Sequence, residues 1–401
     1  MNQILKMKNP IQDYAWGSHR ALAELLGRPV PSPDPEAELW MGAHPKAPSM
    51  VSIAGRWQPL PELIASEPQT ILGRSVSRKF KDQLPYLFKV LAIAKPLSIQ
   101  AHPNRQQAQE GYEKENRLRI PLNAPNRNYK DDNHKPECIC ALTTFSALCG
   151  FRKVDRIITL MERVSHPALG RVLRHLSAAP VEQGLRNFLH GLMTINPVTR
   201  EDVIRTAVRE VRGMAHPEPA YHWLLRLHEY YSDDVGILAP LFLNRIDLAP
   251  GEALYLPAGE LHAYLQGVGI ELMANSDNVL RGGLTSKHID LPELMQVLNF
   301  AVREIEVLTP EKHPGGELLY KTPAAEFMLS AIQTTEATRY HSPAKRSIEM
   351  LLCVHGQAWI EVPGVQARIE VRKGTSVVVP AAVPSYTIKG NAKFYKAAVP
   401  I

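Results

Sequence analysis

Hydrophobic and polar positions follow two different periods along this chain. Between residues 154 and 238, apolar side chains recur every three or four positions, which is the spacing of amphipathic helices. Before and after this block, short apolar runs rich in β-branched and aromatic residues are separated by Pro and Gly turns, which is typical of strands. The pattern therefore predicts β-rich segments interrupted by a block of helices.

These changes in pattern also predict the domain organisation. Residues 1–152 and 240–318 are expected to form one discontinuous β domain, residues 153–239 a helical domain, and residues 319–401 a C-terminal β domain. A chain of 401 residues is long for a single core, which agrees with this division. The expected fold class is mainly β with an α-helical insertion.

Composition narrows the function classes. The 45% share of hydrophobic residues is ordinary for a globular chain, and four cysteines without paired spacing do not make a disulfide framework or a zinc ribbon. The net charge of +6 comes from scattered basic residues, so a small anionic partner fits and nucleic acid is not indicated. With no apolar run suited to a signal peptide or a membrane span, we expect a cytoplasmic protein without a membrane partner. We also expect a monomer.

Metal-competent side chains stand close together in the stretch from Leu97 to Pro103. Side chains of a strand alternate between its faces, so Ser98, Gln100 and His102 share one face. Gln100 and His102 are candidate metal ligands. The alternative is an ordinary half-buried strand whose polar side faces water.

Two further charged residues stand in apolar settings. Glu137 follows Pro136 and enters an apolar run, so it is expected to be buried and to need a cation or several hydrogen bonds. A salt bridge to Lys135 or Arg152 is the alternative to a metal. Lys89 lies in the buried strand predicted over residues 84–94, and it needs a partner for the same reason.

The most specific motif combines Gly251, Pro257, Gly259 and His262. It resembles the second motif of the cupin superfamily, G-x5-P-x-G-x2-H-x3-N, with Gln266 in place of the final Asn. In cupins this histidine is a metal ligand inside a small β barrel, and Gln100 and His102 are similar to the H-x-H pair of the first motif.

A second copy of the turn pattern begins at Gly374, but Ser385 stands where the histidine is expected. The resemblance thus implies two cupin-like jelly-roll barrels, of which the C-terminal one is degenerate and holds no metal. Any β-rich domain with Gly-Pro turns is the alternative for that copy.

Several motifs that occur in the same order along the chain identify the family within the superfamily. Residues 14–17, 100–102, 133–137, 257–267 and 273–285 together resemble type I mannose-6-phosphate isomerase, and the resemblance weakens after about Asp290. It implies a zinc-dependent aldose–ketose isomerase that interconverts D-mannose 6-phosphate and D-fructose 6-phosphate through an enediol or enediolate. The zinc ligands that it implies, for one Zn²⁺ per chain, are Gln100, His102, Glu137 and His262.

The same resemblance implies roles for other residues. Glu271 matches the position proposed as the base, and a buried salt-bridge partner is the alternative. Arg281 matches the catalytic arginine, whose charge would stabilise the enediolate or bind phosphate. Lys135 and Asp277 are further candidates for proton shuttling or orientation. The phosphate-binding positions fall on Ser98, Lys89 and Lys287. One departure is Ser286, where the family usually has proline, and a looser turn there would affect Lys287. A non-catalytic cupin that senses a sugar phosphate is the alternative function; a cupin iron dioxygenase fits poorly because Gln100 replaces a histidine.

Overall fold

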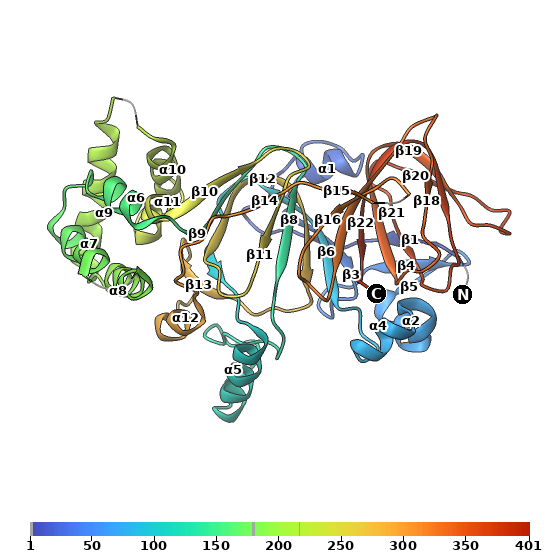
Figure 1. The fold of residues 1–401 in the computed structure, drawn as a ribbon, viewed down its shortest axis with the longest axis horizontal. Coiled ribbons are helices and arrows are strands. Elements are labelled where there is room, and N and C mark those ends of the chain that lie inside the picture. The colour runs from blue at the N-terminus through green and yellow to red at the C-terminus, as the bar shows by residue number, and fades with distance from the viewer. Residues whose placement is uncertain (1–2, 179–180, 216, 314) are drawn as a thin grey trace.

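The computed structural model describes residues 3–178, 181–215, 217–313 and 315–401. Two β barrels lie next to each other along the long axis of the molecule, and a block of helices extends from the first barrel at one end (Figure 1). The prediction of a mainly β fold with a helical insertion is confirmed. The domain boundaries proposed from the sequence remain a prediction.

The first barrel is an antiparallel sheet in which β12 (His262–Ala274) is the central strand. The second half of β12 pairs with β6 (Tyr86–Ile93) and β8 (Glu137–Ala141), and its first half pairs with β7 (Ile99–Ala101) and β9 (Phe145–Phe151). The remaining strands are β2 (Ile11–Gln12), β3 (Glu38–Gly42), β10 (Leu243–Leu248), β11 (Ala253–Leu256), β13 (Leu280–Gly283) and β14 (Val307–Leu308).

Gly267 is the point at which β12 passes from one set of partners to the other. Its φ of +127° lies in the region that side chains with a Cβ rarely adopt, and a Cβ there would lie 2.7 Å from the carbonyl oxygen of Thr144. The glycine therefore allows one long strand to serve both sides of the barrel, with His262 at one end and Glu271 near the other.

The second barrel is built around the pairing of β19 (Glu349–Glu361) with β22 (Thr387–Ala398). Its other C-terminal strands are β15 (Glu311–His313), β16 (Glu317–Tyr320), β17 (Met328–Thr334), β18 (Tyr340–His341), β20 (Ile369–Arg372) and β21 (Ser376–Val379). N-terminal strands complete it, since β1 (Leu5–Lys8) pairs with β21 and with β4 (Met50–Ile53), which pairs with β5 (Arg56–Pro59). The sequence interpretation had grouped these N-terminal residues with the first domain.

The helical block carries the predicted three- and four-residue spacing. Its helices are α6 (Val154–Met161), α7 (Pro167–Ala178), α8 (Val181–Met193), α9 (Pro197–Arg212), α10 (Pro219–His228), the 3₁₀ helix η1 (Val235–Leu238) and α11 (Ala239–Phe242). Asn196 caps α9 by accepting a hydrogen bond from the backbone N–H of Thr199, and Pro197 takes the first helical position. The apolar faces of these helices share one core with Ile99 and Leu261 of the first barrel.

The two barrels also share a core. Tyr86, Phe88 and Ile270 of the first barrel pack with Leu329 and Met350 of the second in one buried cluster. The remaining helices lie at the edges of the barrels: α1 (Ala21–Leu25), α2 (Leu60–Ser66), α3 (Pro68–Leu72), α4 (Arg74–Lys79), α5 (Arg105–Arg117) and α12 (Leu291–Val297). This continuous packing holds the first barrel between the helical block and the second barrel.

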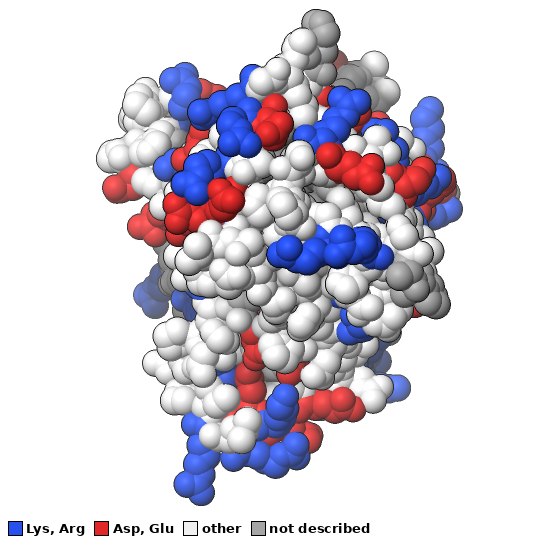
Figure 2. Space-filling model, turned by 90° about the vertical axis from the view of Figure 1, so that its left-hand side faces the viewer, with Lys and Arg blue, Asp and Glu red and all other residues white. Residues whose placement is uncertain are grey.

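The surface at the helical end carries mixed charge. Figure 2 shows Lys and Arg interspersed with Asp and Glu over this face. Within the described residues, none of the helices is both long enough and apolar enough to cross a membrane.

Candidate metal centre and active site

Three buried side chains from separate strands meet in the first barrel. His102 follows β7, Glu137 is the first residue of β8, and His262 is the first residue of β12. Their ligand atoms all lie within 4.8 Å of one another. Glu137 Oε1 is 3.3 Å from His102 Nε2, and Glu137 Oε2 is 3.5 Å from His262 Nε2. The structure thus brings together three of the four predicted metal ligands around one point.

Backbone carbonyls orient both imidazoles of this cluster. His102 Nδ1 lies 2.8 Å from the carbonyl oxygen of Asn278, and His262 Nδ1 lies 2.9 Å from that of Glu260. A carbonyl oxygen can only accept, so Nδ1 carries the proton in each ring and the Nε2 lone pairs are directed at Glu137. Burial lowers the pKa of His102 to about 4, so its imidazole is neutral at pH 7. Neutral imidazole is the form that coordinates a metal ion.

The atoms of the cluster that lack hydrogen-bond partners are suited to binding a cation. His102 Nε2, His262 Nε2 and Glu137 Oε2 are buried and make no hydrogen bond. Buried polar atoms are usually paired because an unpaired one loses its hydration. Two imidazole nitrogens and a carboxylate are a common donor set for zinc in catalytic sites, where a coordination position stays open.

Gln100 and Lys135 lie beside this cluster. Gln100 is paired in register with His262 across β7 and β12, and its side chain lines the adjacent cavity. Lys135 Nζ lies 3.0 Å from Glu137 Oε1, so the alternative salt bridge exists alongside the cluster. Burial acts to raise the pKa of Glu137, but Lys135 and His102 outweigh it and hold that pKa well below its usual value. Glu137 is therefore ionised at neutral pH, as a metal ligand must be.

A cavity of about 550 Å³ opens next to the cluster, a volume that suits a small ligand. It brings together predicted residues from distant parts of the chain: Lys89, Ser98, Gln100, Lys135, Glu137, Glu271, Arg281 and Lys287.

Arg281 and Lys287 bring positive charge to this cavity. In the described part of the chain, neither side chain has a recorded ion pair or hydrogen bond. Burial lowers the pKa of Arg281, and burial together with the neighbouring Arg281 lowers that of Lys287. The arrangement favours an anionic ligand, because an anion would compensate both charges.

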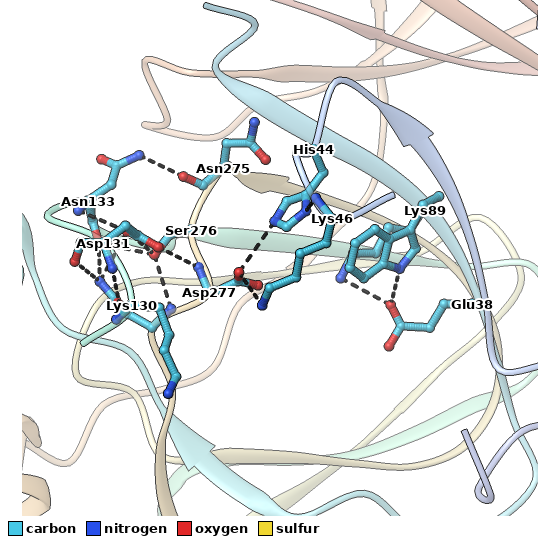
Figure 3. Close-up of polar contacts among 12 residues, drawn as sticks. Glu38, His44, Lys46, Lys89, Lys130, Asp131, Asn133, Asn275, Ser276 and Asp277 are labelled. Atoms are coloured by element: carbon cyan, nitrogen blue, oxygen red, sulfur yellow. Dashed lines mark hydrogen bonds and ion pairs between the residues drawn. The ribbon is translucent and has the colours of Figure 1, made fainter. Parts of the chain in front are cut away.

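Glu271 shares a lysine with a second carboxylate. Lys89 Nζ is 3.1 Å from Glu271 Oε2 and 3.2 Å from Glu38 Oε2, and Figure 3 shows Lys89 directed at Glu38. Burial acts to lower the pKa of Lys89, but the two carboxylates raise it above its usual value. Burial also raises the pKa of Glu271, and Lys89 opposes part of that rise. Lys89 thus lies between two carboxylates rather than facing an open anion site.

Asp277 lies apart from the cavity residues. Its Oδ2 is 2.7 Å from Lys46 Nζ and 3.6 Å from His44 Nε2. Figure 3 shows both side chains directed at Asp277. Burial acts to raise the pKa of Asp277, but His44 and Lys46 hold it well below its usual range. A carboxyl with so low a pKa is a poor proton acceptor at neutral pH.

The loop around Asp277 positions His102. Asn278, whose carbonyl accepts from His102, is fully buried, and its side-chain amide donates to the carbonyl oxygen of Asp131 at 2.8 Å. Asp131 Oδ1 accepts from Ser276 Oγ at 2.8 Å, within the network drawn in Figure 3. These bonds fix the carbonyl that orients the ligand histidine.

The sequence interpretation did not assign roles to Glu38, Tyr231 or Asp234. Tyr231, from the helical block, lines the cavity, and its hydroxyl donates to the carbonyl oxygen of Pro96 at 2.7 Å. Asp234 Oδ2 accepts from the backbone N–H of Thr285 at 3.0 Å, which ties the loop leading to Lys287 to the helical block. No local motif marks these residues, because each acts through a partner far away in sequence.

Comparisons with known proteins agree with this site. The family model "Phosphomannose isomerase type I, catalytic domain" matches residues 4–154. Mannose-6-phosphate isomerase of Shigella flexneri is 40% identical over 393 residues, covering 97% of both chains. The Homo sapiens protein of that name is 33% identical over 399 residues, covering 93% of this chain and 92% of its own.

Solved structures are equally similar over the whole chain. A crystal structure of zinc-bound mannose 6-phosphate isomerase has a TM-score of 0.92 at 37% identity, with 99% of this chain and 100% of that chain covered. A mutant of phosphomannose isomerase from Salmonella typhimurium has a TM-score of 0.93 at 36% identity, with the same coverage.

Proposed function

The chain belongs to the type I phosphomannose isomerase family, and from this membership we infer that it is a zinc-dependent mannose-6-phosphate isomerase. It interconverts D-mannose 6-phosphate and D-fructose 6-phosphate. The observation that supports this activity most directly is the buried cluster of His102, Glu137 and His262. Its atoms without hydrogen-bond partners converge on one point, and the cavity beside them is lined by the cations Arg281 and Lys287, which are unpaired in the described part of the chain.

We propose that Gln100, His102, Glu137 and His262 hold one zinc ion. Two neutral imidazoles, an amide oxygen and one carboxylate leave a bound Zn²⁺ with a net charge of about +1, which suits a Lewis acid better than a closed structural site. When bound, zinc supplies stabilisation of negative charge on a substrate oxygen. The protein's own contribution is the orientation of both imidazoles through Asn278 and Glu260.

The phosphate group is assigned to Arg281, Lys287 and Ser98. Both cations line the cavity without a recorded protein partner, and Ser98 adds a hydroxyl to the same wall. Lys89 was a further candidate from the sequence. Because Lys89 is already paired with Glu38 and Glu271, we assign it the task of holding Glu271 in place rather than gripping phosphate.

Glu271 is the proposed base. The isomerisation takes a proton from C2 of the aldose and returns it to C1, while the C1 and C2 oxygens carry the charge of an enediolate. Burial raises the pKa of Glu271 toward the range in which one carboxylate can both accept and return a proton. Lys135 remains the second candidate for proton transfer because it lines the same cavity. Asp277 is assigned a positioning role, since His44 and Lys46 neutralise it.

Charge on the enediolate can be balanced by groups that need no rearrangement. Arg281 keeps a fixed positive charge at the cavity wall, and Lys135 lies next to Glu137. Preorganised cations of this kind stabilise developing charge more effectively than water, which must reorient during the reaction.

We further propose a monomer that works in the cytoplasm. A non-catalytic sensor would need the phosphate grip but not a buried carboxylate in the position of Glu271.

A coupled assay tests the activity directly. The zinc-loaded protein should form fructose 6-phosphate from mannose 6-phosphate, lose this activity on removal of the metal by a chelator, and regain it with Zn²⁺. Binding of mannose 6-phosphate without turnover by zinc-loaded protein would instead identify a sensor.

A further inference from the structure

The second barrel encloses a cluster of buried charged side chains that the isomerase reaction does not use. Lys396 Nζ lies 2.8 Å from Glu317 Oε1 and 3.1 Å from Glu349 Oε1. Arg346 Nη1 lies 3.5 Å from Glu349 Oε2. The side chains of Lys396, Glu349 and Arg346 are each 2% exposed, so they are almost completely removed from water. Burying this many charges is costly, and packing alone gives no reason for it.

Strand register places this cluster where the first barrel has its active-site carboxylates. Glu137 begins β8 and pairs with Met273 of β12, and Glu271 stands two residues before Met273. In the second barrel Glu349 begins β19 and pairs with Ala398 of β22, and Lys396 stands two residues before Ala398.

The turn motif aligns His262 with Ser385, and on that alignment Glu349 matches Glu137 while Lys396 matches Met273, two residues beyond Glu271. Glu271 is paired with a residue of β6, and Lys396 is paired with Ser330 of β17. The buried charges therefore lie at corresponding ends of the paired strands, β8 and β12 in the first barrel and β19 and β22 in the second.

A cavity of about 290 Å³ adjoins this cluster. Its lining includes Glu317, Arg346, Glu349 and Lys396, together with the exposed Lys345. The volume is at the lower end of the range for small-molecule sites.

Hydrogen-bonding capacity is left unused at this cavity. Arg346 Nη2 donates to the carbonyl oxygen of Pro380 at 3.1 Å, but Arg346 Nε and Nη1 make no hydrogen bond, and neither does Glu349 Oε2. Nη1 and Glu349 Oε2 face each other as an ion pair at 3.5 Å, whereas Nε has no hydrogen-bond partner among the described residues. A buried donor without a partner in a cavity wall is unusual unless a ligand uses it.

We propose that this cavity is a second small-molecule site, and that its ligand is a small hydroxylated carboxylate. A carboxylate of the ligand accepts from the free Nε–H of Arg346 and from the ammonium group of Lys345, which lines the same cavity. A hydroxyl of the same ligand donates to Glu349 Oε2. Three basic and two acidic side chains line the cavity, which favours a monoanion.

The donor set also explains why the ligand is not a metal ion. Lys396 and Arg346 together already neutralise Glu317 and Glu349, and the second barrel has Ser385 at the motif position of His262. A divalent cation at this cluster would have to displace a buried ammonium group. The site therefore differs in chemistry from the first barrel even though its place in the fold is equivalent.

Calorimetric titration with D-gluconate tests the proposal on the zinc-loaded full-length enzyme. The wild type should bind one equivalent with a dissociation constant below about 1 mM, whereas D-glucose, which lacks the carboxylate, and acetate, which lacks hydroxyls, should bind more weakly. Arg346→Gln should weaken D-gluconate binding by about tenfold to a hundredfold, the range for losing a charged hydrogen bond, while kcat and KM for mannose 6-phosphate stay within about twofold. Arg368→Gln, at an exposed arginine of the same barrel, is the matched control and should change neither quantity.

Two results would overturn the proposal. D-gluconate binding that survives Arg346→Gln but is lost in Arg281→Gln would place the carboxylate in the isomerase cavity. An absence of D-gluconate binding at millimolar concentration would exclude this ligand class. If Arg346→Gln does not fold, a crystal structure of the wild type with D-gluconate replaces it: density against Arg346 and Glu349 supports the site, and density only in the first barrel rejects it. The coupled assay reads the isomerase activity separately.

Discussion

Each of the two barrels buries a carboxylate at the first residue of a corresponding strand, Glu137 of β8 and Glu349 of β19, but surrounds it with different groups. Glu137 faces two imidazoles whose Nε2 atoms have no hydrogen-bond partner, so the first barrel presents a converging set of donors. Glu349 faces Lys396, and the second barrel supplies its own counter-ion. Glu137 also has a lysine partner, Lys135, so the difference lies in the imidazoles: the first barrel can hold a metal because neutral donor atoms without other partners in the described chain converge on its buried carboxylate.

The largest effect should follow from removing a histidine of the first barrel. His262→Ala deletes a donor and should cost the bound zinc and at least about a 1,000-fold loss in kcat/KM, because a Lewis acid contributes several kcal/mol to the barrier. Metal analysis and the coupled assay measure both. His355→Ala, at an exposed histidine of the second barrel, should leave zinc and activity unchanged. Full zinc retention in His262→Ala would remove this residue from the ligand set.

Glu271→Gln tests the base without changing the shape of the side chain. We expect zinc and substrate binding to persist while kcat falls by roughly two to four powers of ten, which is the range for losing a general base. Solvent exchange of the C2 proton should fall in step with turnover. Glu304→Gln, at a side chain that is 93% exposed, is the control.

The pH profile gives a second check on the same residue. The base acts only when ionised, and burial raises the pKa of Glu271 above 4.5, so the wild-type kcat/KM should decline with falling pH along a limb that lies above pH 4.5. That limb should be absent in Glu271→Gln. If the variant turns over or exchanges the C2 proton at the original rate, Lys135 becomes the base to test.

The buried lysine of the second barrel should affect stability rather than activity. Lys396→Met leaves Glu317 and Glu349 buried without their shared cation, which should lower the free energy of unfolding by about 3–5 kcal/mol. Activity per folded, zinc-loaded molecule should stay near the wild-type value. Denaturant unfolding and the coupled assay separate the two quantities, with Lys373→Met at an exposed lysine as control. A loss of kcat without a loss of stability would mean that the second barrel takes part in the reaction.

A smaller effect is expected at the contact between the helical block and the cavity. Asp234→Ala removes the acceptor for the backbone N–H of Thr285, so the loop before Lys287 should loosen and KM should rise by about tenfold at most, with little change in kcat. Asp233→Ala, at the exposed neighbouring residue, is the matched control. An unchanged KM in Asp234→Ala would show that the loop holds its place without the helical block.

Local motifs made part of this site predictable from sequence. His262 follows a Pro-x-Gly turn, and Glu137 follows a proline at the head of an apolar strand, so each could be identified within about ten residues of chain. The helical block was equally clear because its apolar period extends over many turns. The prediction of a mainly β fold with this insertion was correct for the same reason.

Contacts between distant segments could not be predicted in this way. The pairing of Lys89 with Glu38 and Glu271 depends on the register of β3, β6 and β12, which no single segment encodes. Likewise β1 joins β21 of the second barrel, and its short alternating pattern fits either sheet. Lys89 was assigned to phosphate from the family resemblance, which matches positions but does not give the partners of a side chain, and the pairing with Glu38 and Glu271 appears only in the structure.

Anomalous X-ray diffraction at the zinc absorption edge, on crystals of the zinc-loaded enzyme, tests the contrast between the barrels most directly. The account predicts a single protein-bound zinc peak per chain, in the first barrel, with ligands from His102, Glu137 and His262. A peak among Glu317, Glu349 and their neighbours in the second barrel, or a zinc-loaded active enzyme with no peak at His262, would contradict it.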